Sequence, residues 1–168
     1  MKVGIIGLGY VGLPLAVAFA EAGHAVVGLD SDARKVERLR DGRSEVEDVP
    51  GERLSALGDS FAPTTDHAAL AECDAVPICV PTPLANHREP DLTYLVDAAT
   101  SLSGVLRERQ LVVLESTTYP GTTRDRLKPI LEESGLVAGR DFHLAYSPER
   151  IDPGRTDYTI RTLSLIHI

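Results

Sequence analysis

Three glycines near the start of the chain have a spacing that suits the binding of a dinucleotide. Gly7, Gly9 and Gly12 form the pattern G-x-G-x-x-G between two apolar runs, KVGIIG and LPLAVAFA. In this pattern the first glycine permits a tight turn, the second lets a pyrophosphate approach the backbone, and the third lets a helix pack closely on a strand. The amides at the start of that helix would then face the phosphates. Alone the pattern is weak, because glycine-rich loops also occur as plain turns.

An acidic residue follows the glycines at a matching distance. Asp30 ends the apolar run HAVVGLD, eighteen residues after Gly12. In a dinucleotide fold an acid at this point accepts hydrogen bonds from the adenosine ribose and repels a 2′-phosphate, so we expect NAD rather than NADP. The alternative is that Asp30 caps the next helix, a role that Ser31 or Asp32 could equally fill.

The same opening segment could be taken for a membrane anchor or a secretory signal. Residues 3–20 carry no charge, and AVAFA offers the small residues of a cleavage site. Four glycines and Pro14 oppose a single helix, because glycine is entropically costly in a helix and proline lacks an amide donor. We therefore expect a strand over 2–7 and a helix over 11–23 that ends at Gly23.

Apolar strands alternate with helical stretches along the rest of the chain, which predicts an α/β fold with a doubly wound parallel sheet of the Rossmann type. The other expected strands are 24–30, 61–66, 74–83, 110–117 and a sixth that begins at 141; the other expected helices are 32–42, a short one within 43–57, 91–106 and 121–134. Three unusual segments, VPTPLANHREPD, ESTTYPGTT and YSPERIDPG, follow strands. Because parallel strands end at one edge of the sheet, we expect these segments to share a site, although each alone could be a proline-rich turn.

Composition excludes several classes of protein. The 168 residues carry a formal charge of −8 with scattered Lys and Arg, which argues against a nucleic-acid partner. Two cysteines, Cys73 and Cys79, cannot form a disulfide framework, and no His or Cys group has zinc-ligand spacing. We expect no metal, no membrane partner and a cytoplasmic location.

With these residues in place, the sequence resembles the UDP-glucose/UDP-N-acetylhexosamine 6-dehydrogenase family, which oxidises a sugar's primary alcohol to a carboxylate with two NAD. The resemblance runs from GIIGLGYVGLPLA through LDSDARKVERLRDGRS, CVPTP and ESTTYPGTT to SPERIDPG, and covers the chain to about residue 162. The segments GRSEVEDV, TPLANHREPDLTY, STTYPGTT and SPERIDPG look most like the UDP-N-acetylglucosamine 6-dehydrogenases of that family. The epimer of the sugar stays open.

The resemblance implies a role for each matching residue. Those implied to bind the cofactor are Gly7, Gly9, Tyr10, Val11 and Gly12 at the pyrophosphate, Asp30 and Lys35 at the adenosine half, and Thr82 and Thr117 towards the nicotinamide. Thr117 is also implied to hold an active-site water. Glu149, beside the substrate with Arg150, is implied to orient or activate the water of the hydrolytic step, a task that suits a carboxylate. A surface ion pair between Glu149 and Arg150 is the alternative.

Oxidation of an aldehyde to an acid needs a covalent intermediate. A cysteine thiolate attacks the aldehyde, and a second hydride transfer leaves a thioester. The resemblance implies that this cysteine and an assisting lysine lie in a later domain, beyond this chain. Cys79 falls within an apolar strand and Cys73 precedes it, so both are expected to be small core or near-surface residues and not activated nucleophiles. We therefore expect an N-terminal cofactor part that is inactive alone, belonging to an enzyme that forms a homodimer or higher oligomer. A β-hydroxyacid dehydrogenase and a stand-alone NAD-binding module are the alternatives.

Two features depart from the family's pattern. Pro77 lies within a central strand, where it removes a ladder hydrogen bond, and is either a tolerated bulge or a sequencing error. The terminal LSLIHI, residues 163–168, is expected to be a non-native tail, which leaves 1–162 as the NAD-binding domain; a native apolar C-terminus is the alternative.

Overall fold

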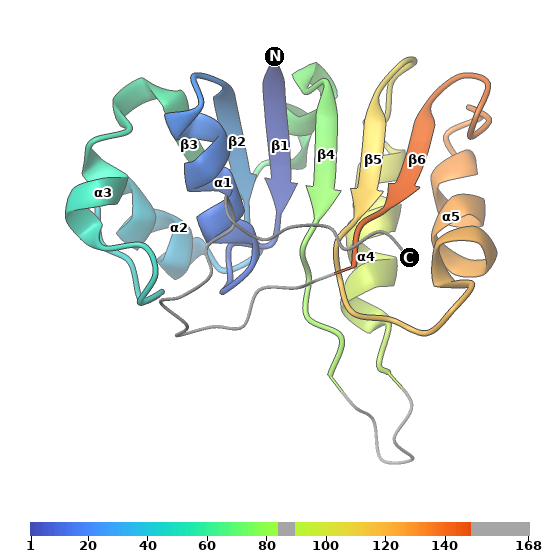
Figure 1. Ribbon diagram of the computed structural model, residues 1–168. Helices are drawn as coiled ribbons and strands as arrows, with labels where there is room; N and C mark the ends of the chain where they lie inside the picture. Colours follow the sequence, from blue (N-terminus) through green and yellow to red (C-terminus); the bar gives the residue numbers. More distant parts are fainter. Residues whose placement is uncertain (84–89, 149–168) are drawn as a thin grey trace, which may run out of the picture.

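Six parallel strands form a single sheet in the computed structural model, which describes residues 1–83 and 90–148 (Figure 1). The strands are β1 (Lys2–Ile6), β2 (Ala25–Leu29), β3 (Phe61–Thr64), β4 (Ala75–Ile78), β5 (Leu111–Leu114) and β6 (His143–Tyr146). Their order is β3-β2-β1-β4-β5-β6, and each neighbouring pair is parallel. The predicted doubly wound sheet is confirmed. The order reverses between β1 and β4, which is where such sheets open a crevice for ligands.

The helices agree with most of the predicted ones. They are α1 (Gly12–Glu21), α2 (Ala33–Arg40), α3 (Gly51–Ser55), α4 (Thr93–Ser103) and α5 (Lys128–Glu132), with the 3-10 turns η1 (Gly58–Ser60) and η2 (His67–Glu72) and the π-helical turn η3 (Thr123–Leu127). The turn η2 was not predicted, and the helix expected over 121–134 is divided into η3 and α5. Pro129 has no N–H to donate to the carbonyl four residues earlier, which fits the wider π-helical turn before it.

An apolar core lies on each face of the sheet. Side chains alternate along a strand, so Val3 and Ile5 pack with Leu13 and Val17 of α1, while Ile6 belongs to the core of α4 and α5 on the other face. The uncharged segment 3–20 is thus β1, a loop and α1, as predicted. Within the described residues, no helix has both the length and the apolar character needed to span a membrane.

Pro77 is accommodated in β4 without shifting the strand. The register with β5 is continuous, and Pro77 pairs with Val113. The pairs with β1 are only Val3↔Ala75 and Ile6↔Ile78, on either side of the proline. Since proline has no N–H, the gap between these two pairs is the expected loss of one ladder bond.

Candidate dinucleotide site

The loop between β1 and α1 uses its three glycines in different ways. Gly7 has φ +93°, and a Cβ there would lie 2.6 Å from the carbonyl oxygen of Cys79. A Cβ on Gly12 would lie 1.8 Å from the carbonyl oxygen of Gly7, so α1 packs directly on the loop. A Cβ on Gly9 would meet no atom within 4 Å. The fold itself therefore requires Gly7 and Gly12, whereas Gly9 leaves open the space that an approaching pyrophosphate would need.

The backbone amides next to Gly9 have no hydrogen-bond acceptor among the described residues. Helix α1 begins with the bonds from Leu13 N to Gly9 O, at 3.1 Å, and from Leu15 N to Val11 O, at 3.2 Å. The N–H groups of Gly9, Tyr10 and Val11 donate to no atom in residues 1–83 and 90–148. No acidic side chain lies in the first turn, and no side chain caps it. Free amides at the positive end of a helix dipole are what a phosphate group binds.

Asp30 lies at the end of β2, beside this loop, with 8% of its surface exposed. Its Oδ2 accepts hydrogen bonds from Leu8 N at 2.9 Å and from Lys35 Nζ at 2.7 Å, and its Oδ1 accepts one from Asp32 N at 3.0 Å. Asp32, not Asp30, caps α2, because its Oδ1 accepts from Arg34 N and Lys35 N. These amide bonds, that of Lys35 foremost, lower the pKa of the Asp32 carboxyl. The alternative in which Asp30 caps the helix is wrong.

The loops that follow β4 and β5 are hydrogen-bonded to each other. Thr82 Oγ1 donates to the carbonyl oxygen of Thr117, and Ser116 Oγ donates to the carbonyl oxygen of Val80 at 2.7 Å. The residue before Val80, Cys79, is the one that approaches Gly7. The structure therefore brings Thr82 and Thr117 together at the edge of the sheet that carries the glycine loop. Glu149 and Arg150 lie outside the described residues.

Sequence reasoning missed two residues of this region. The Leu8 amide bonds an acid 22 residues away, and no residue pattern reports such a backbone contact. Ser116 is 4% exposed, and its bond to Val80 fixes the position of the loop after β5. The change from the apolar strand β5 to the polar residues Glu115 and Ser116 was the available signal for Ser116.

Both cysteines are buried, which decides between the core and near-surface positions left open by the sequence. Cys73 is fully buried, and burial raises the pKa of its thiol, the opposite of what an activated nucleophile needs. Cys79 is 8% exposed at the end of β4. Within residues 1–83 and 90–148, no group of His, Cys, Asp and Glu is arranged to hold a metal ion.

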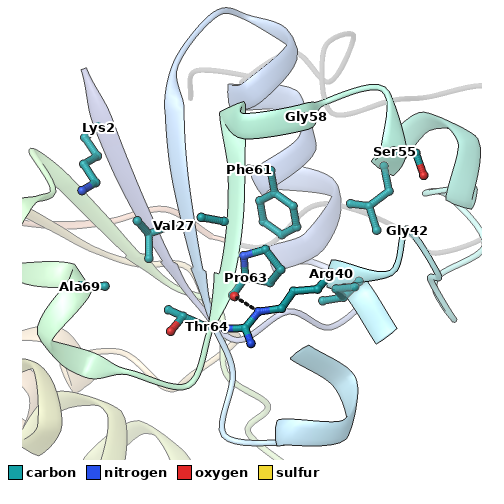
Figure 2. A pocket seen from close by; sticks show the side chains of 13 residues that line it. Lys2, Val27, Arg40, Gly42, Ser55, Gly58, Phe61, Pro63, Thr64 and Ala69 are labelled. Carbon is teal, nitrogen blue, oxygen red and sulfur yellow. Dashed lines mark hydrogen bonds between the residues drawn. The ribbon is translucent and has the colours of Figure 1, made fainter. Parts of the chain in front are cut away.

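A cavity of about 630 Å³ lies elsewhere, against the edge strand β3 (Figure 2). It is lined by Lys2, Arg40, Phe61 and Pro63 among others, and the Arg40 Nε–H donates to the carbonyl oxygen of Pro63 at 3.0 Å. None of the described residues predicted to bind the cofactor lines it. This cavity is therefore separate from the dinucleotide site.

Known proteins match nearly all of this chain. Residues 1–164 match the model of the UDP-glucose/GDP-mannose dehydrogenase family, NAD binding domain. UDP-N-acetyl-D-glucosamine 6-dehydrogenase of Pseudomonas aeruginosa is 40% identical over 99% of this chain and 39% of its own length. The solved UDP-D-ManNAc dehydrogenase of Pyrococcus horikoshii superposes with a TM-score of 0.86 at 36% identity, over 92% of this chain and 38% of that one. A ternary complex of GDP-mannose dehydrogenase from Pseudomonas aeruginosa gives the same TM-score at 32% identity, over 91% of this chain and 37% of that one.

The described residues fit NAD, the cofactor of this family of domains. The space beside Gly9 and the free amides of Tyr10 and Val11 suit the pyrophosphate, and Asp30 lies within the same site. The chain spans about two fifths of the length of the relatives it matches. Its sequence, its strand order and its glycine loop agree with the family match: this chain belongs to the UDP-glucose/GDP-mannose dehydrogenase family, of which it carries the NAD-binding domain.

Proposed function

We propose that this chain is the NAD-binding part of a nucleotide-sugar 6-dehydrogenase. The enzyme oxidises the C6 alcohol of UDP-N-acetylglucosamine, or of a close UDP-N-acetylhexosamine, to the uronate with two NAD. The observation that carries the proposal is the meeting of three loops, after β1, β4 and β5, at one edge of the sheet. It is supported by the printed activity of the Pseudomonas aeruginosa relative, a UDP-N-acetyl-D-glucosamine 6-dehydrogenase.

Within this proposal the chain's own residues position the reactants and exclude competing reactions, while NAD supplies the acceptor for hydride. Thr82 and Thr117 lie towards the nicotinamide end, and Thr117 holds a water. Glu149 orients that water for hydrolysis of a thioester, with Arg150 near the sugar nucleotide. The thioester forms on a cysteine of a later domain, so this chain alone binds NAD and does not turn over.

The test is an assay of the enzyme translated from the complete reading frame. We expect two NADH per UDP-N-acetylglucosamine, measured by absorbance at 340 nm and by end-point analysis of the uronate. UDP-N-acetylmannosamine, UDP-N-acetylgalactosamine and UDP-glucose are compared at equal concentration. A clear preference for UDP-glucose, or one NADH per sugar, would contradict the proposal.

A substitution of Glu149 tests whether this residue acts in thioester hydrolysis or in the hydride transfers. Glu149→Gln keeps the size of the side chain and removes the carboxylate, so we expect both NADH of the first turnover to form at near-normal rates and thioester hydrolysis to slow at least 100-fold. Because the thioester forms only after the second hydride transfer, a burst of two NADH per active site would report the accumulated acyl-enzyme. Loss of the burst together with the steady rate would place Glu149 outside the hydrolytic step.

A further inference from the structure

Asp30 contacts the phosphate-binding loop directly. Its Oδ2 accepts a hydrogen bond from the amide of Leu8, which lies between Gly7 and Gly9, at 2.9 Å. We infer that Asp30 is a positioning residue for this loop as well as an acceptor for the adenosine ribose. The inference rests on the proposed function, since it assigns a second role to an acid of the same NAD site.

The bond to Leu8 is the contact that fixes the middle of the loop. The two ends of the loop are held by the bond from Gly7 N to Leu29 O, at 2.8 Å, and by the bond from Leu13 N to Gly9 O. Leu8 itself is 1% exposed, and the carboxylate of Asp30 is the acceptor of its amide in the described residues. A buried N–H that has lost its acceptor is destabilising, which favours a rearranged loop. The carboxylate therefore fixes the loop, and with it the phosphate-facing amides, before any cofactor arrives.

The same carboxylate has limited capacity for further hydrogen bonds. An ionised carboxylate offers about four acceptor positions. Three are taken, by Leu8 N, Asp32 N and Lys35 Nζ. Two of these donors are backbone amides, whereas Lys35 ends in a flexible side chain that is 32% exposed. One ribose hydroxyl can therefore bind with every partner in place, and a second hydroxyl displaces Lys35 while Leu8 keeps its bond.

This arrangement links the ribose and pyrophosphate ends of the site through one side chain. A ligand that contains pyrophosphate and no ribose separates the two roles, because it depends on the loop alone. If Asp30 served only the ribose, its removal would not change the affinity for such a ligand. If Asp30 positions the loop, its removal weakens the binding of that ligand.

The decisive variant is Asp30→Ala combined with Lys35→Met, which leaves the net charge of the site unchanged. The probe is inorganic pyrophosphate, titrated by NMR into the ¹⁵N-labelled 168-residue chain and followed at the amides of Tyr10 and Val11. Hydrogen exchange of the Leu8 amide is measured in parallel, relative to the core amides of Val26 and Val112. We expect at least tenfold faster relative exchange at Leu8 and at least fivefold weaker binding of pyrophosphate.

Three further variants support the comparison. Lys35→Met alone retains the acceptor, so the relative exchange at Leu8 stays unchanged. Asp66→Ala removes an acid after the neighbouring strand β3, where it bonds Ala68 N, and both readouts stay unchanged. Asp30→Asn with Lys35→Met is the substitute if the first variant does not fold. It keeps the shape of the side chain and one acceptor oxygen, so we expect changes in Leu8 exchange and pyrophosphate binding in the same direction but smaller.

The two proposals fail differently. Unchanged exchange at Leu8, or unchanged pyrophosphate affinity beside a loss of NAD⁺ affinity, overturns the positioning role and leaves the NAD site intact. Absence of NAD⁺ binding by the folded native chain overturns the proposed function. In that case the exchange rate of the Leu8 amide still decides whether Asp30 holds the loop.

Discussion

The glycines of the loop after β1 differ in which contacts exclude a side chain at each position. Gly12 is constrained by the chain itself, because a Cβ there would lie 1.8 Å from a backbone oxygen. A Cβ on Gly9 would have no such neighbour, and Gly9 has no positive φ, so the fold of the chain would tolerate a side chain at this position. We therefore expect the ligand, and not the fold, to require glycine at position 9.

Substituting the two glycines by alanine separates folding from binding. Gly9→Ala leaves the melting temperature within about 1 °C, since alanine is compatible with its backbone, and weakens NAD⁺ binding about tenfold or more. Gly12→Ala forces the loop and α1 apart and costs about 3 kcal/mol of unfolding free energy. Urea unfolding and calorimetry measure both quantities. A destabilised Gly9→Ala chain would contradict the assignment of its constraint to the ligand.

The sequence predicted these residues because their spacing and the acid after β2 form a recognisable set. It could not predict which carboxylate oxygen meets which donor. Asp30 had two readings, ribose acceptor or helix cap, and the structure removed the second because Asp32 holds the first amides of α2. The contact between Asp30 and Leu8 depends on how β1 and β2 lie side by side, and residue types do not report that register.

At the scale of elements, the end of the sheet opposite the glycine loop is held by a buried amide. Gln110, directly before β5, is fully buried, and its Nε2 donates to the carbonyl oxygens of Leu70 and Cys73 at 2.9 and 2.7 Å. These bonds join η2 and the start of β4 to β5. They stabilise the sheet without contact with the cofactor site.

Replacing Gln110 should therefore lower stability and spare binding. Gln110→Leu keeps the volume and removes the donor from buried carbonyls, which costs about 2 kcal/mol of unfolding free energy. NAD⁺ affinity stays within twofold of the native chain. Arg124→Gln, which breaks an exposed ion pair with Asp125, is the control and costs under about 0.5 kcal/mol. Weaker NAD⁺ binding by the folded Gln110→Leu chain would show that the two ends of the sheet are coupled.

The turn before β6 gives a dependence on pH. Hydrogen bonds from Arg140, and then from the amide of Val137, lower the pKa of Asp141 from 3.8 to about 2. A carboxyl with a lowered folded-state pKa stabilises the fold above its unfolded value and loses that contribution as the pH falls through the folded value. The contribution of Asp141 is therefore complete above about pH 4 and is lost towards pH 2.

Asp141→Asn tests this window, because asparagine can still accept from Val137 N but not as an anion from Arg140. The difference in melting temperature between native and variant chains should be constant from pH 7 to about pH 4 and shrink towards pH 2. Thermal unfolding followed by circular dichroism at each pH provides the measurement. Arg140→Gln should give the same profile, and a difference that grows on acidification would have the wrong sign.

The elements were predictable where their apolar periodicity is strong. All six strands fall within predicted ranges, but β4 and β5 are shorter than expected. Apolar residues, Cys79 and Val80, continue past the last residue of β4, whereas β5 ends before the charged Glu115. The division of the helix over 121–134 was not foreseen. Its cause, the missing amide of Pro129, is visible in the sequence, yet a proline early in a helix is usually tolerated.

On the scale of the whole molecule, the candidate cofactor residues come from several elements that meet at one end of the sheet. They lie in the loop between β1 and α1, at the end of β2 and in the loops after β4 and β5. The chain spans about two fifths of the length of its relatives. The sequence indicated a parallel sheet, but not the order of the strands, which depends on how each crossover returns. That order places β1 beside β4 and so brings Cys79 against Gly7.

Binding of NAD⁺ by the 168-residue chain tests this account most directly. Isothermal titration calorimetry of the folded chain, with folding established by circular dichroism, should give saturable binding of NAD⁺ at one site. Affinity for NADP⁺ should be at least tenfold weaker, because the carboxylate of Asp30 at the end of β2 would repel the 2′-phosphate of a dinucleotide bound there. A folded chain that binds no NAD⁺, or that prefers NADP⁺, would contradict the account.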